Sequence, residues 1–405
     1  MRDRVILHCD CNSFFASVET ALNPEFRNVP MAVCGSQEER HGIVLAKNEL
    51  AKSYGIKTAD TVYSAKRACP ELLIARPHYD KYVEFSERVN RIYREYTDLV
   101  EPFGIDESWL DVTASERVFG SGTRIAEEIR RRIREEIGIT VSIGVSFNKV
   151  FAKLGSDYKK PDAVTVIDRK NYTRLVYPLP VGDLLFVGRR SIEELSRYGI
   201  RTIGELAGAP PNFLCEKMGK FGDMIYRYAR GEDYSRVTPP SDDAKSIGNG
   251  FTFKHDLVKF EEIKSGVDLL SEEIGRRLRR HSRQATTISV SIKDEYMRVV
   301  QRQSTLDNPT DIGREISDAA MRIIKDFWAS GKPIRSITVT AQNLSDSDTS
   351  AEQIDMFESQ AARNTREKVR RGEVVVDEIK RRFGSEAICK AADMDEEVGS
   401  FEPKT

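Results

Sequence analysis

The chain has 405 residues, of which 40% are hydrophobic, and a formal net charge of −1, a composition that suits roughly two to four globular domains. No stretch approaches about 18 uninterrupted apolar residues, and no basic segment followed by an apolar run stands at the N-terminus, which argues against a membrane span and a secretory signal. The 6 cysteines form no CxxC pair and only 5 histidines occur, so we expect neither a zinc framework nor a disulfide scaffold, and the reducing cytoplasm is the expected compartment.

The N-terminal part predicts alternating strands and helices. Residues 5–10 (VILHCD) form an apolar run that predicts a buried strand, and a helix is expected through residues 15–19, where Ser13 can cap it. A further helix is expected at residues 82–96. After it, two strands fold around the turn at residues 104–107 (GIDE).

The next elements complete this first region. Isoleucines recur every four residues from 125 to 137 with arginines between them, which predicts an amphipathic helix with one apolar stripe. Residues 139–145 (ITVSIGV) alternate and predict a half-buried strand. Strands and helices interleaved in this way predict an α+β sheet that helices cover on one face.

The composition changes near residue 170, and short helical pieces with glycines extend from there to about residue 231. Residues 238–243 (TPPSDD) have the chemistry of a linker. Beyond the linker, alternating strands frame two helices and predict a separate small α+β domain. The expected elements lie at about 260–281, 288–292, 310–329 and 334–340.

Charge is distributed unevenly over the C-terminal part. Residues 244–343 hold 17 Lys/Arg against 13 Asp/Glu, a net charge of +4, whereas residues 344–405 hold 10 against 15, a net charge of −5. In the net charge of the whole chain, the acidic tail therefore cancels a mildly basic domain. We expect this tail to be mobile apart from one helix. Local charge rather than the total decides whether a surface can bind phosphate.

Three acidic residues carry the chemistry that the sequence predicts. Asp10 ends the first strand, and Asp106 and Glu107 occupy the turn between two strands, so a sheet could bring all three to one concave edge. Taken singly, such acids are more often solvated surface, but burial beside apolar strands is costly unless a cation pairs with them. Mg²⁺ fits, because it prefers hard oxygen ligands and leaves positions open for substrate phosphates. Two such ions can activate a hydroxyl group and stabilise a leaving pyrophosphate.

Three long motifs follow one another along the chain: residues 10–19 (DCNSFFASVE), residues 101–111 (EPFGIDESWLD) and residues 144–161 (GVSFNKVFAKLGSDYKKP). They resemble, in order and content, the motifs of the Y family of lesion-bypass DNA polymerases, closest to its DinB and DNA polymerase IV branch. The similarity extends from residue 4 to about residue 343. The resemblance implies a template-directed DNA polymerase that adds deoxynucleotides to a primer in translesion synthesis, with low fidelity and low processivity. Primer–template DNA, a deoxynucleoside triphosphate and two Mg²⁺ ions would be its ligands, and we expect a monomer.

The resemblance also implies the fold, which is an α+β right hand with a C-terminal little-finger domain. By position, the expected parts are a palm (1–20 and 78–166), fingers (21–77), a helix-hairpin-helix thumb (167–232), a linker (233–243), a little finger (244–343) and a tail (344–405).

Carried over by position, Asp10, Asp106 and Glu107 become the catalytic metal ligands, with the backbone carbonyl group of Cys11 as a fourth ligand. In the family these ligands hold both metal ions, so the resemblance assigns the carboxylates the role that their charge pattern already suggested.

The resemblance assigns a nucleotide site next to these carboxylates. Phe15 matches the steric gate, whose ring fills the space of a ribose 2′-hydroxyl group; without the resemblance, it would be predicted as a core aromatic residue. The backbone amides of Ser13 and Phe14 would meet the triphosphate at a helix N-terminus. Lys160 matches the family's triphosphate lysine, although by itself it would be an ordinary exposed lysine.

The fingers depart from the family pattern at residues 46–52 (AKNELAK). Glu49 stands where many members have a tyrosine and Lys52 where they have an arginine, and the UmuC branch has a similar pattern. Because a carboxylate beside a triphosphate is unfavourable, we expect Glu49 to point away from the site. Lys52, with Lys47 in support, is expected to bind the phosphates as a point charge.

Two regions are expected to contact DNA. Residues 185–206 resemble a helix-hairpin-helix in which the backbone at Val187 and Gly188 approaches a phosphate, although such hairpins also serve as packing turns. In the little finger, a run of arginines would lie along the duplex, unless it is only a solvated helix end. These arginines are Arg276, Arg277, Arg279, Arg280 and Arg283.

The tail contains residues 353–357 (QIDMF), which resemble the bacterial sliding-clamp motif with Gln353, Met356 and Phe357 as anchors, although chance matches to so short a pattern are common. Two other interpretations stay open. One is a DNA-binding accessory protein of the same fold that has lost catalysis, against which the three intact carboxylates speak. The other is a nucleotide cyclase built on a similar palm, against which the helix-hairpin-helix speaks.

Overall fold

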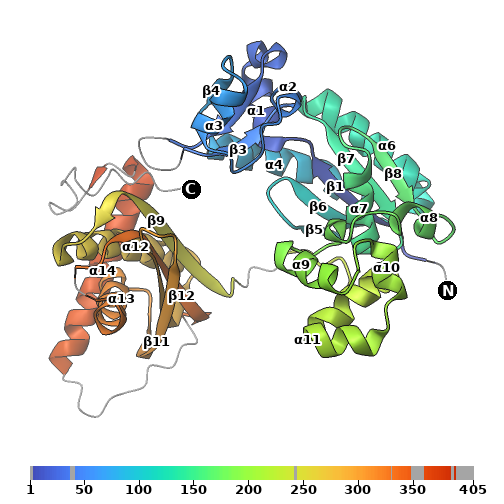
Figure 1. Ribbon diagram of the computed structural model, residues 1–405. Coiled ribbons are helices and arrows are strands. Elements are labelled where there is room, and N and C mark those ends of the chain that lie inside the picture. Colours follow the sequence, from blue (N-terminus) through green and yellow to red (C-terminus); the bar gives the residue numbers. More distant parts are fainter. Residues whose placement is uncertain are drawn as a thin grey trace. The chain divides into compact units, whose positions relative to one another are not determined.

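The computed structural model describes residues 3–36, 42–240, 244–329, 331–347, 360–384 and 387–388. The chain divides into two compact units. The first comprises Met1–Gly35 and Ile43–Pro240, and the second comprises Ser36–Gly42 and Ser241–Thr405. Both described parts mix helices and strands, as the sequence predicts (Figure 1). Over the described residues, no helix combines the length and apolar character needed to cross a membrane.

The first unit is organised around a five-stranded sheet with strand order β5-β6-β1-β7-β8. Its strands are β1 (Ile6–Cys11), β5 (Val100–Pro102), β6 (Glu107–Asp111), β7 (Val141–Ser146) and β8 (Val164–Ile167). Neighbouring strands are antiparallel except for the parallel pair β7–β8. β1 lies in the middle of the sheet and is buried along its whole length, which agrees with its continuous apolar run.

Helices cover both faces of this sheet, so the prediction of a single covered face is wrong. Leu7, Cys9 and Cys11 of β1 point into a core built with α4 (Tyr79–Arg94) and α6 (Gly122–Arg132). The expected amphipathic helix continues beyond α6 as a π-helical turn (Ile133–Ile137), and a short helix α5 (Glu116–Phe119) precedes it.

The second face of the sheet carries α7 (Lys149–Tyr158), which packs against β1, β7 and β8. Two glycines allow the close approach. A Cβ atom on Gly144 would lie 1.9 Å from the carbonyl oxygen of Ala152, and one on Gly155 would lie 2.9 Å from the Cα atom of Gly144. The glycine of the alternating strand is therefore a packing position for α7, which brings the side chains of this helix over Asp10.

A smaller sheet with strand order β3-β2-β4 lies beside α1 (Phe14–Leu22), whose Ala16 packs against Met31 and Val33. Its strands and helices are β2 (Met31–Cys34), β3 (Val44–Lys47), β4 (Leu73–Ala75), α2 (Glu49–Ser53) and α3 (Val62–Ala68), with a 3₁₀ turn at Pro24–Asn28. Ser13 precedes α1 in a left-handed conformation with φ of 47° and forms no side-chain cap, contrary to the expected capping role.

The rest of the first unit is helical. It contains α8 (Tyr172–Val176), a 3₁₀ turn (Val181–Asp183), α9 (Arg189–Arg197), α10 (Ile203–Gly208) and α11 (Pro211–Ala229). These helices share a core with Phe151 of α7, and a capping box between Thr202 and Glu205 starts α10.

The second unit has a four-stranded antiparallel sheet with order β11-β10-β12-β9 and two helices over one face (Figure 1). Its elements are β9 (Ser246–Leu257), α12 (Phe260–Arg280), β10 (Arg283–Lys293), β11 (Val299–Thr310), α13 (Gly313–Phe327) and β12 (Ile334–Asp346). The sequence did not predict β9 and β11. Both are edge strands with many exposed residues, so they lack the apolar alternation that marks β10 and β12.

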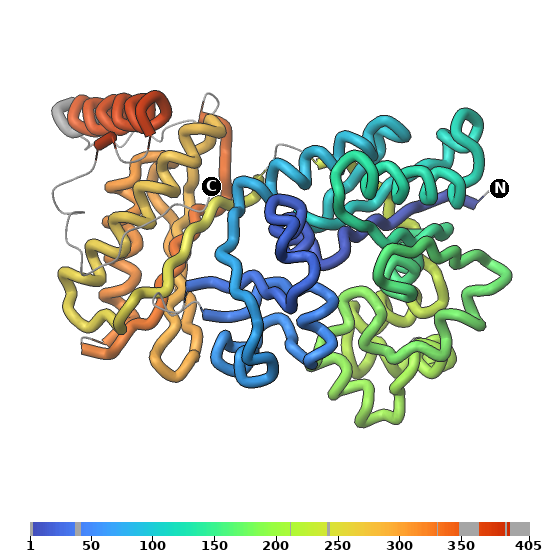
Figure 2. The backbone as a smooth tube through the Cα atoms, turned by 90° about the horizontal axis from the view of Figure 1, so that it is seen from above, coloured from blue at the N-terminus to red at the C-terminus, as the bar shows by residue number. Residues whose placement is uncertain are grey.

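The helix expected in the tail is present as α14 (Gln360–Phe383; Figure 2). Ion pairs join it to α12, to α13 and to Asp311 just before α13. Arg370 donates to both carboxylate oxygens of Asp311, whose side chain is only 1% exposed. In a second set of ion pairs, α14 supplies the acids: Arg279 of α12, which is 8% exposed, pairs with Glu373 and Asp377. α14 is therefore a packed part of this unit.

Replacing Arg370 by alanine is expected to destabilise the second unit by about 3 kcal/mol, because the buried Asp311 would lose its cation. Arg371→Ala is the matched control. Arg371 is 76% exposed and pairs only one turn away with Glu367, so its loss should cost less than about 0.5 kcal/mol. Guanidinium unfolding, followed by Trp328 fluorescence in a Trp109→Phe background, measures the difference. Equal losses in the free energy of unfolding for both variants would contradict the conclusion that α14 is packed on the second unit through Arg370.

Candidate active site

The sheet of the first unit brings the three predicted carboxylates together. Asp10 on β1 lies opposite Glu107 on β6 in the strand register. The amide group of Cys11 donates to the carbonyl oxygen of Asp106 over 2.9 Å, which holds the turn against the end of β1. The Asp10 and Glu107 side chains are 12% and 18% exposed, so both acids are largely withdrawn from water.

Two lysines lie against this cluster. Lys153 of α7 places its Nζ atom 3.1 Å from Asp10 Oδ2 and 2.7 Å from Glu107 Oε2. Lys160, just beyond α7, places its Nζ atom 2.8 Å from the same Asp10 oxygen. Both ammonium groups also contact Asp157. Lys160 was predicted at the site, whereas Lys153 is an additional residue that only the packing of α7 reveals.

The carboxylates ionise differently because their neighbours differ. Burial alone would raise the pKa of Glu107, but His8 and Lys153 lower the pKa to about 2. Burial, together with the charges of Asp10 and Glu107, raises the pKa of Asp106 above its usual value. Within the described residues Asp106 has no ion pair, unlike its two neighbours. The cluster thus keeps a negative charge that is not balanced at the position of Asp106.

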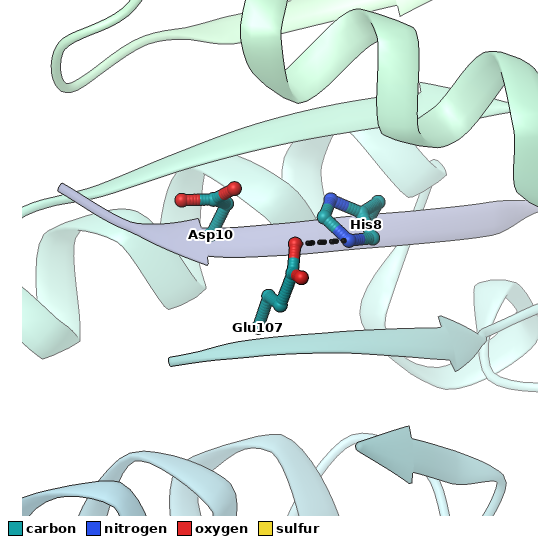
Figure 3. Close-up of side chains that lie close together, drawn as sticks. All are labelled: His8, Asp10 and Glu107. Carbon is teal, nitrogen blue, oxygen red and sulfur yellow. Dashed lines mark ion pairs between the residues drawn. The ribbon is translucent and has the colours of Figure 1, made fainter. Parts of the chain in front are cut away.

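His8 is a further residue of this cluster (Figure 3). It lies two positions before Asp10 on the same face of β1 and is fully buried, with its Nε2 atom 3.3 Å from Glu107 Oε2. Burial lowers the pKa of His8 despite the neighbouring carboxylates, which favours the neutral ring.

The donor set fits a divalent metal ion. His8, Asp10 and Glu107 each offer a ligand atom, and these atoms lie within 4.8 Å of one another. Carboxylate oxygens are the ligands that hard cations such as Mg²⁺ prefer, and the unbalanced charge near Asp106 favours a cation there. The Cys11 side chain is buried and its thiol faces the core, so only its backbone carbonyl group could take part.

A cavity of about 370 Å³ opens beside the carboxylates. Asp10 and Asp106 line it together with Lys47, Lys52 and Lys160, so carboxylates and ammonium groups share its wall. Phe15 also lines it. Its ring stacks on Tyr82 with 4.1 Å between centroids and 11° between planes, and meets Tyr79 edge-on. Phe15 is therefore both a packed aromatic residue and part of the cavity wall, while Phe14 is a core residue.

The expectation that Glu49 points away from the site is wrong. Glu49 lines the cavity, and its Oε1 atom lies 2.5 Å from Lys52 Nζ. The Ser13 hydroxyl group donates to the same carboxylate over 3.4 Å. The α2 helix explains this orientation, because Glu49 and Lys52 stand three residues apart on one helical face. Lys47, which donates to Thr58 over 3.0 Å, also lines the cavity.

The predicted DNA-contacting residues lie in both units. In the first, the Val187 side chain is buried and Gly188 precedes the first turn of α9, next to an exposed Phe186 with φ of 70°. In the second, four of the five arginines have partners within their unit and Arg280 is exposed. The partners are Glu273 for Arg276, the Gly248 carbonyl group for Arg277, Glu373 and Asp377 for Arg279, and Asp346 for Arg283. The predicted clamp anchors Gln353, Met356 and Phe357 lie outside the described residues.

Comparisons with known proteins agree with this arrangement. Residues 9–157 match the model of the impB/mucB/samB family, and residues 244–356 match the C-terminal domain model of the same family. A DNA polymerase IV of Acetivibrio thermocellus is 45% identical over 94% of this chain and 95% of its own length. DNA polymerase IV 2 of Bacillus subtilis is 38% identical over 99% of this chain and 97% of its own length. The chain belongs to the Y family of DNA polymerases.

A solved structure agrees on the fold. A Y-family DNA polymerase chimera of Dbh and Dpo4 superposes with a TM-score of 0.76 at 23% identity, covering 84% of this chain and 99% of the chimera. The chain therefore has the right-hand polymerase fold, with an α+β C-terminal unit that corresponds to a little finger.

Proposed function

We propose that this polymerase extends a DNA primer along a template by two-metal-ion transfer of deoxynucleotides, with Asp10, Asp106 and Glu107 as the metal ligands. The observation that carries the proposal is the cavity lined both by carboxylates of this cluster and by lysines, since this combination suits a nucleotide with its metal ions. Mg²⁺ ions held there, with the Cys11 carbonyl group as a further ligand, would activate the primer hydroxyl group and stabilise the leaving pyrophosphate.

The other residues of the cavity position the substrate in this proposal. The amides of Ser13 and Phe14 at the start of α1 donate to the triphosphate, where the helix dipole favours anions. Lys160 and Lys52 contribute positive charge on the phosphate side of the cavity. Phe15 excludes the ribose 2′-hydroxyl group, because its ring is held by Tyr82 and cannot easily move aside.

We propose the predicted boundaries for the parts of the right hand: palm 1–20 and 78–166, fingers 21–77, thumb 167–232, linker 233–243, little finger 244–343 and tail 344–405. The backbone at Val187 and Gly188 and the arginines of α12 are the proposed DNA contacts. Arg280, which is exposed, is the best placed of these arginines. Arg279 would need α14 to release it first, because two carboxylates of α14 already occupy it.

Primer extension with Mg²⁺ on an undamaged template and on one with an abasic site tests the proposal. We expect a lengthened primer on both templates, with only a few nucleotides added before the enzyme dissociates. We also propose that the enzyme is a monomer and acts in the cytoplasm. A catalytically inactive accessory protein would give no product, and a nucleotide cyclase would give a cyclic nucleotide without primer. Either outcome would refute the proposed function.

The ion pair between Glu49 and Lys52 leads to a prediction about nucleotide affinity. Glu49→Gln should lower the apparent KM for the deoxynucleotide by about 2- to 5-fold, because it removes a negative charge from the cavity and frees Lys52 for phosphate. Lys52→Ala should raise the KM. Steady-state kinetics at low and high salt measure both, with the differences shrinking in high salt. A Glu49→Gln variant with a raised KM would contradict competition between this carboxylate and the triphosphate.

We further propose that Gln353, Met356 and Phe357 anchor the chain to a bacterial-type sliding clamp. Phe357→Ala should reduce clamp-stimulated synthesis while leaving unstimulated synthesis unchanged. Phe383→Ala is the matched control, since Phe383 is an exposed aromatic residue of the same tail at the end of α14. Primer extension with and without clamp measures the effect, and an equal loss in both assays would count against the motif.

A further inference from the structure

Glu19 of α1 is a buried carboxylate that lies outside the metal-binding cluster. The residue is only 1% exposed, and a buried charged group is costly unless it has partners. One partner is the hydroxyl group of Tyr82 on α4, which lies 2.5 Å from Glu19 Oε1. The other is the ring of His78, whose Nδ1 atom lies 2.9 Å from Oε1 and 3.1 Å from Oε2. The proposed reaction gives this carboxylate no role.

Tyr82 links the buried carboxylate to the wall of the nucleotide cavity. Phe15 and Glu19 stand four residues apart on α1, so their side chains lie on one helical face. The fully buried Tyr82 contacts both of them. Its ring stacks on Phe15 with 4.1 Å between centroids and 11° between planes, and its hydroxyl group donates to Glu19. The hydroxyl end of the ring is thus fixed, while one face of the ring supports Phe15.

We propose that Glu19 is a positioning residue for sugar selection, which holds Tyr82 by its hydroxyl group so that the Tyr82 ring keeps Phe15 in the place of a ribose 2′-hydroxyl group. This inference rests on the proposed function, since it takes Phe15 as the residue that excludes ribonucleotides. Glu19 is not among the described residues that line the cavity, so it acts through Tyr82.

The hydrogen bond to Glu19 is the most directional contact of the Tyr82 ring. Tyr79 meets this ring edge-on, with 5.8 Å between centroids and 75° between planes, and aromatic pairs occur over a range of offsets and centroid distances. A hydrogen bond to an ionised carboxylate is shorter and stronger than one between neutral groups. Burial, together with this hydrogen bond, raises the pKa of Tyr82, so its hydroxyl group keeps the proton that it donates. Without the acceptor, the hydroxyl group would be buried without a partner, which favours a shift of the ring.

His78 separates this role from a simple attachment of α1 to the chain before α4. His78 directly precedes α4, and its side chain is 55% exposed. It contacts the same carboxylate as Tyr82, but the rings of α4 that pack on Phe15 are those of Tyr79 and Tyr82. Removing the His78 ring therefore weakens the attachment of Glu19 and leaves the support of Phe15 in place.

Single-nucleotide insertion kinetics test the proposal through the ratio of kcat/KM for a deoxynucleotide to kcat/KM for the matching ribonucleotide. Tyr82→Phe removes the hydroxyl group and keeps the ring. Glu19→Ala removes the acceptor, whereas Glu19→Gln keeps an acceptor oxygen. His78→Ala is the control that removes the other partner of the carboxylate. A merely structural role would not change the ratio, because a loss of folded protein lowers both values of kcat/KM by the same factor.

Tyr82→Phe and Glu19→Ala are each expected to lower the ratio by about 5- to 10-fold, the size that the loss of one hydrogen bond would give. The double variant Tyr82→Phe/Glu19→Ala should lower the ratio no further, because both substitutions break the same hydrogen bond. Glu19→Gln and His78→Ala should keep the ratio within about 2-fold of the parent, since the hydrogen bond between positions 19 and 82 persists in both.

An unchanged ratio in Tyr82→Phe would overturn the proposal. This variant lacks a single oxygen atom, so the test does not depend on whether Glu19→Ala folds. A fall in His78→Ala as large as that in Glu19→Ala would also overturn the proposal, because it would indicate a general loosening of α1 against α4. Phe15→Ala, measured alongside, distinguishes this failure from that of the proposed function: if its ratio also equals that of the parent, the proposed role of Phe15 itself is refuted.

Discussion

Replacing Asp10 by asparagine is expected to lower the rate of primer extension by at least about 10³-fold, which corresponds to about 4 kcal/mol of transition-state stabilisation. Asp10 lies in register with Glu107 and contacts both Lys153 and Lys160. Without its charge, the carboxylates of Asp106 and Glu107 would only balance the ammonium groups of Lys153 and Lys160, and the cluster would no longer favour metal ions. Single-turnover extension with Mg²⁺ and with Mn²⁺ measures the loss.

Asp157→Asn is the control for this experiment. Asp157 contacts the same two lysines, at 3.5 Å from Lys153 and 2.6 Å from Lys160, but it is 45% exposed and lies on α7 outside the carboxylate cluster. Its replacement should cost less than about tenfold in rate, because it removes a partner of the lysines without removing a proposed metal ligand. An Asp10→Asn variant that keeps its rate within tenfold of the parent would exclude Asp10 as a metal ligand.

Phe15→Ala is expected to admit ribonucleotides. The ratio of kcat/KM for a deoxynucleotide to that for the matching ribonucleotide should fall by about 10²-fold or more, because alanine leaves room for the 2′-hydroxyl group. The parallel stack on Tyr82 explains why the native ring resists displacement, since sliding it aside would break contacts with both Tyr82 and Tyr79. Single-nucleotide insertion kinetics measure the ratio.

Partial unfolding of the variant does not change this ratio, because a loss of active protein lowers the measured kcat/KM for the deoxynucleotide and for the ribonucleotide by the same factor. Phe15→Tyr keeps the ring and should keep the discrimination against ribonucleotides. If Phe15→Ala lost activity with both nucleotides and left the ratio unchanged, Phe15 would be a core residue without a role in sugar selection.

The sequence alone predicted the outline of the carboxylate cluster. The apolar run ending at Asp10 predicted a buried strand, and Asp106 and Glu107 were expected in a turn between two strands, so a sheet could bring them to one edge. The register of β1 and β6 agrees with this. The helices α4, α6, α12 and α13 and the strands β10 and β12 could also be predicted, because their apolar residues recur with a regular period.

Only the tertiary structure decided which other groups join those carboxylates. Lys153 and Ser156 stand on one face of α7, but nothing local indicates that this face meets Asp10 and His8. This arrangement depends on the close packing of Gly155 of α7 on Gly144 of β7. Through it, α7 covers a sheet face that was expected to be open. In the same way, Glu49 lines the cavity because it pairs with Lys52 on the same face of α2. Arg279 points toward α14 because the carboxylate of Glu373 on α14 lies beside it. A sequence shows which side chains are charged, but the packing of segments far apart in the chain decides which groups those side chains contact.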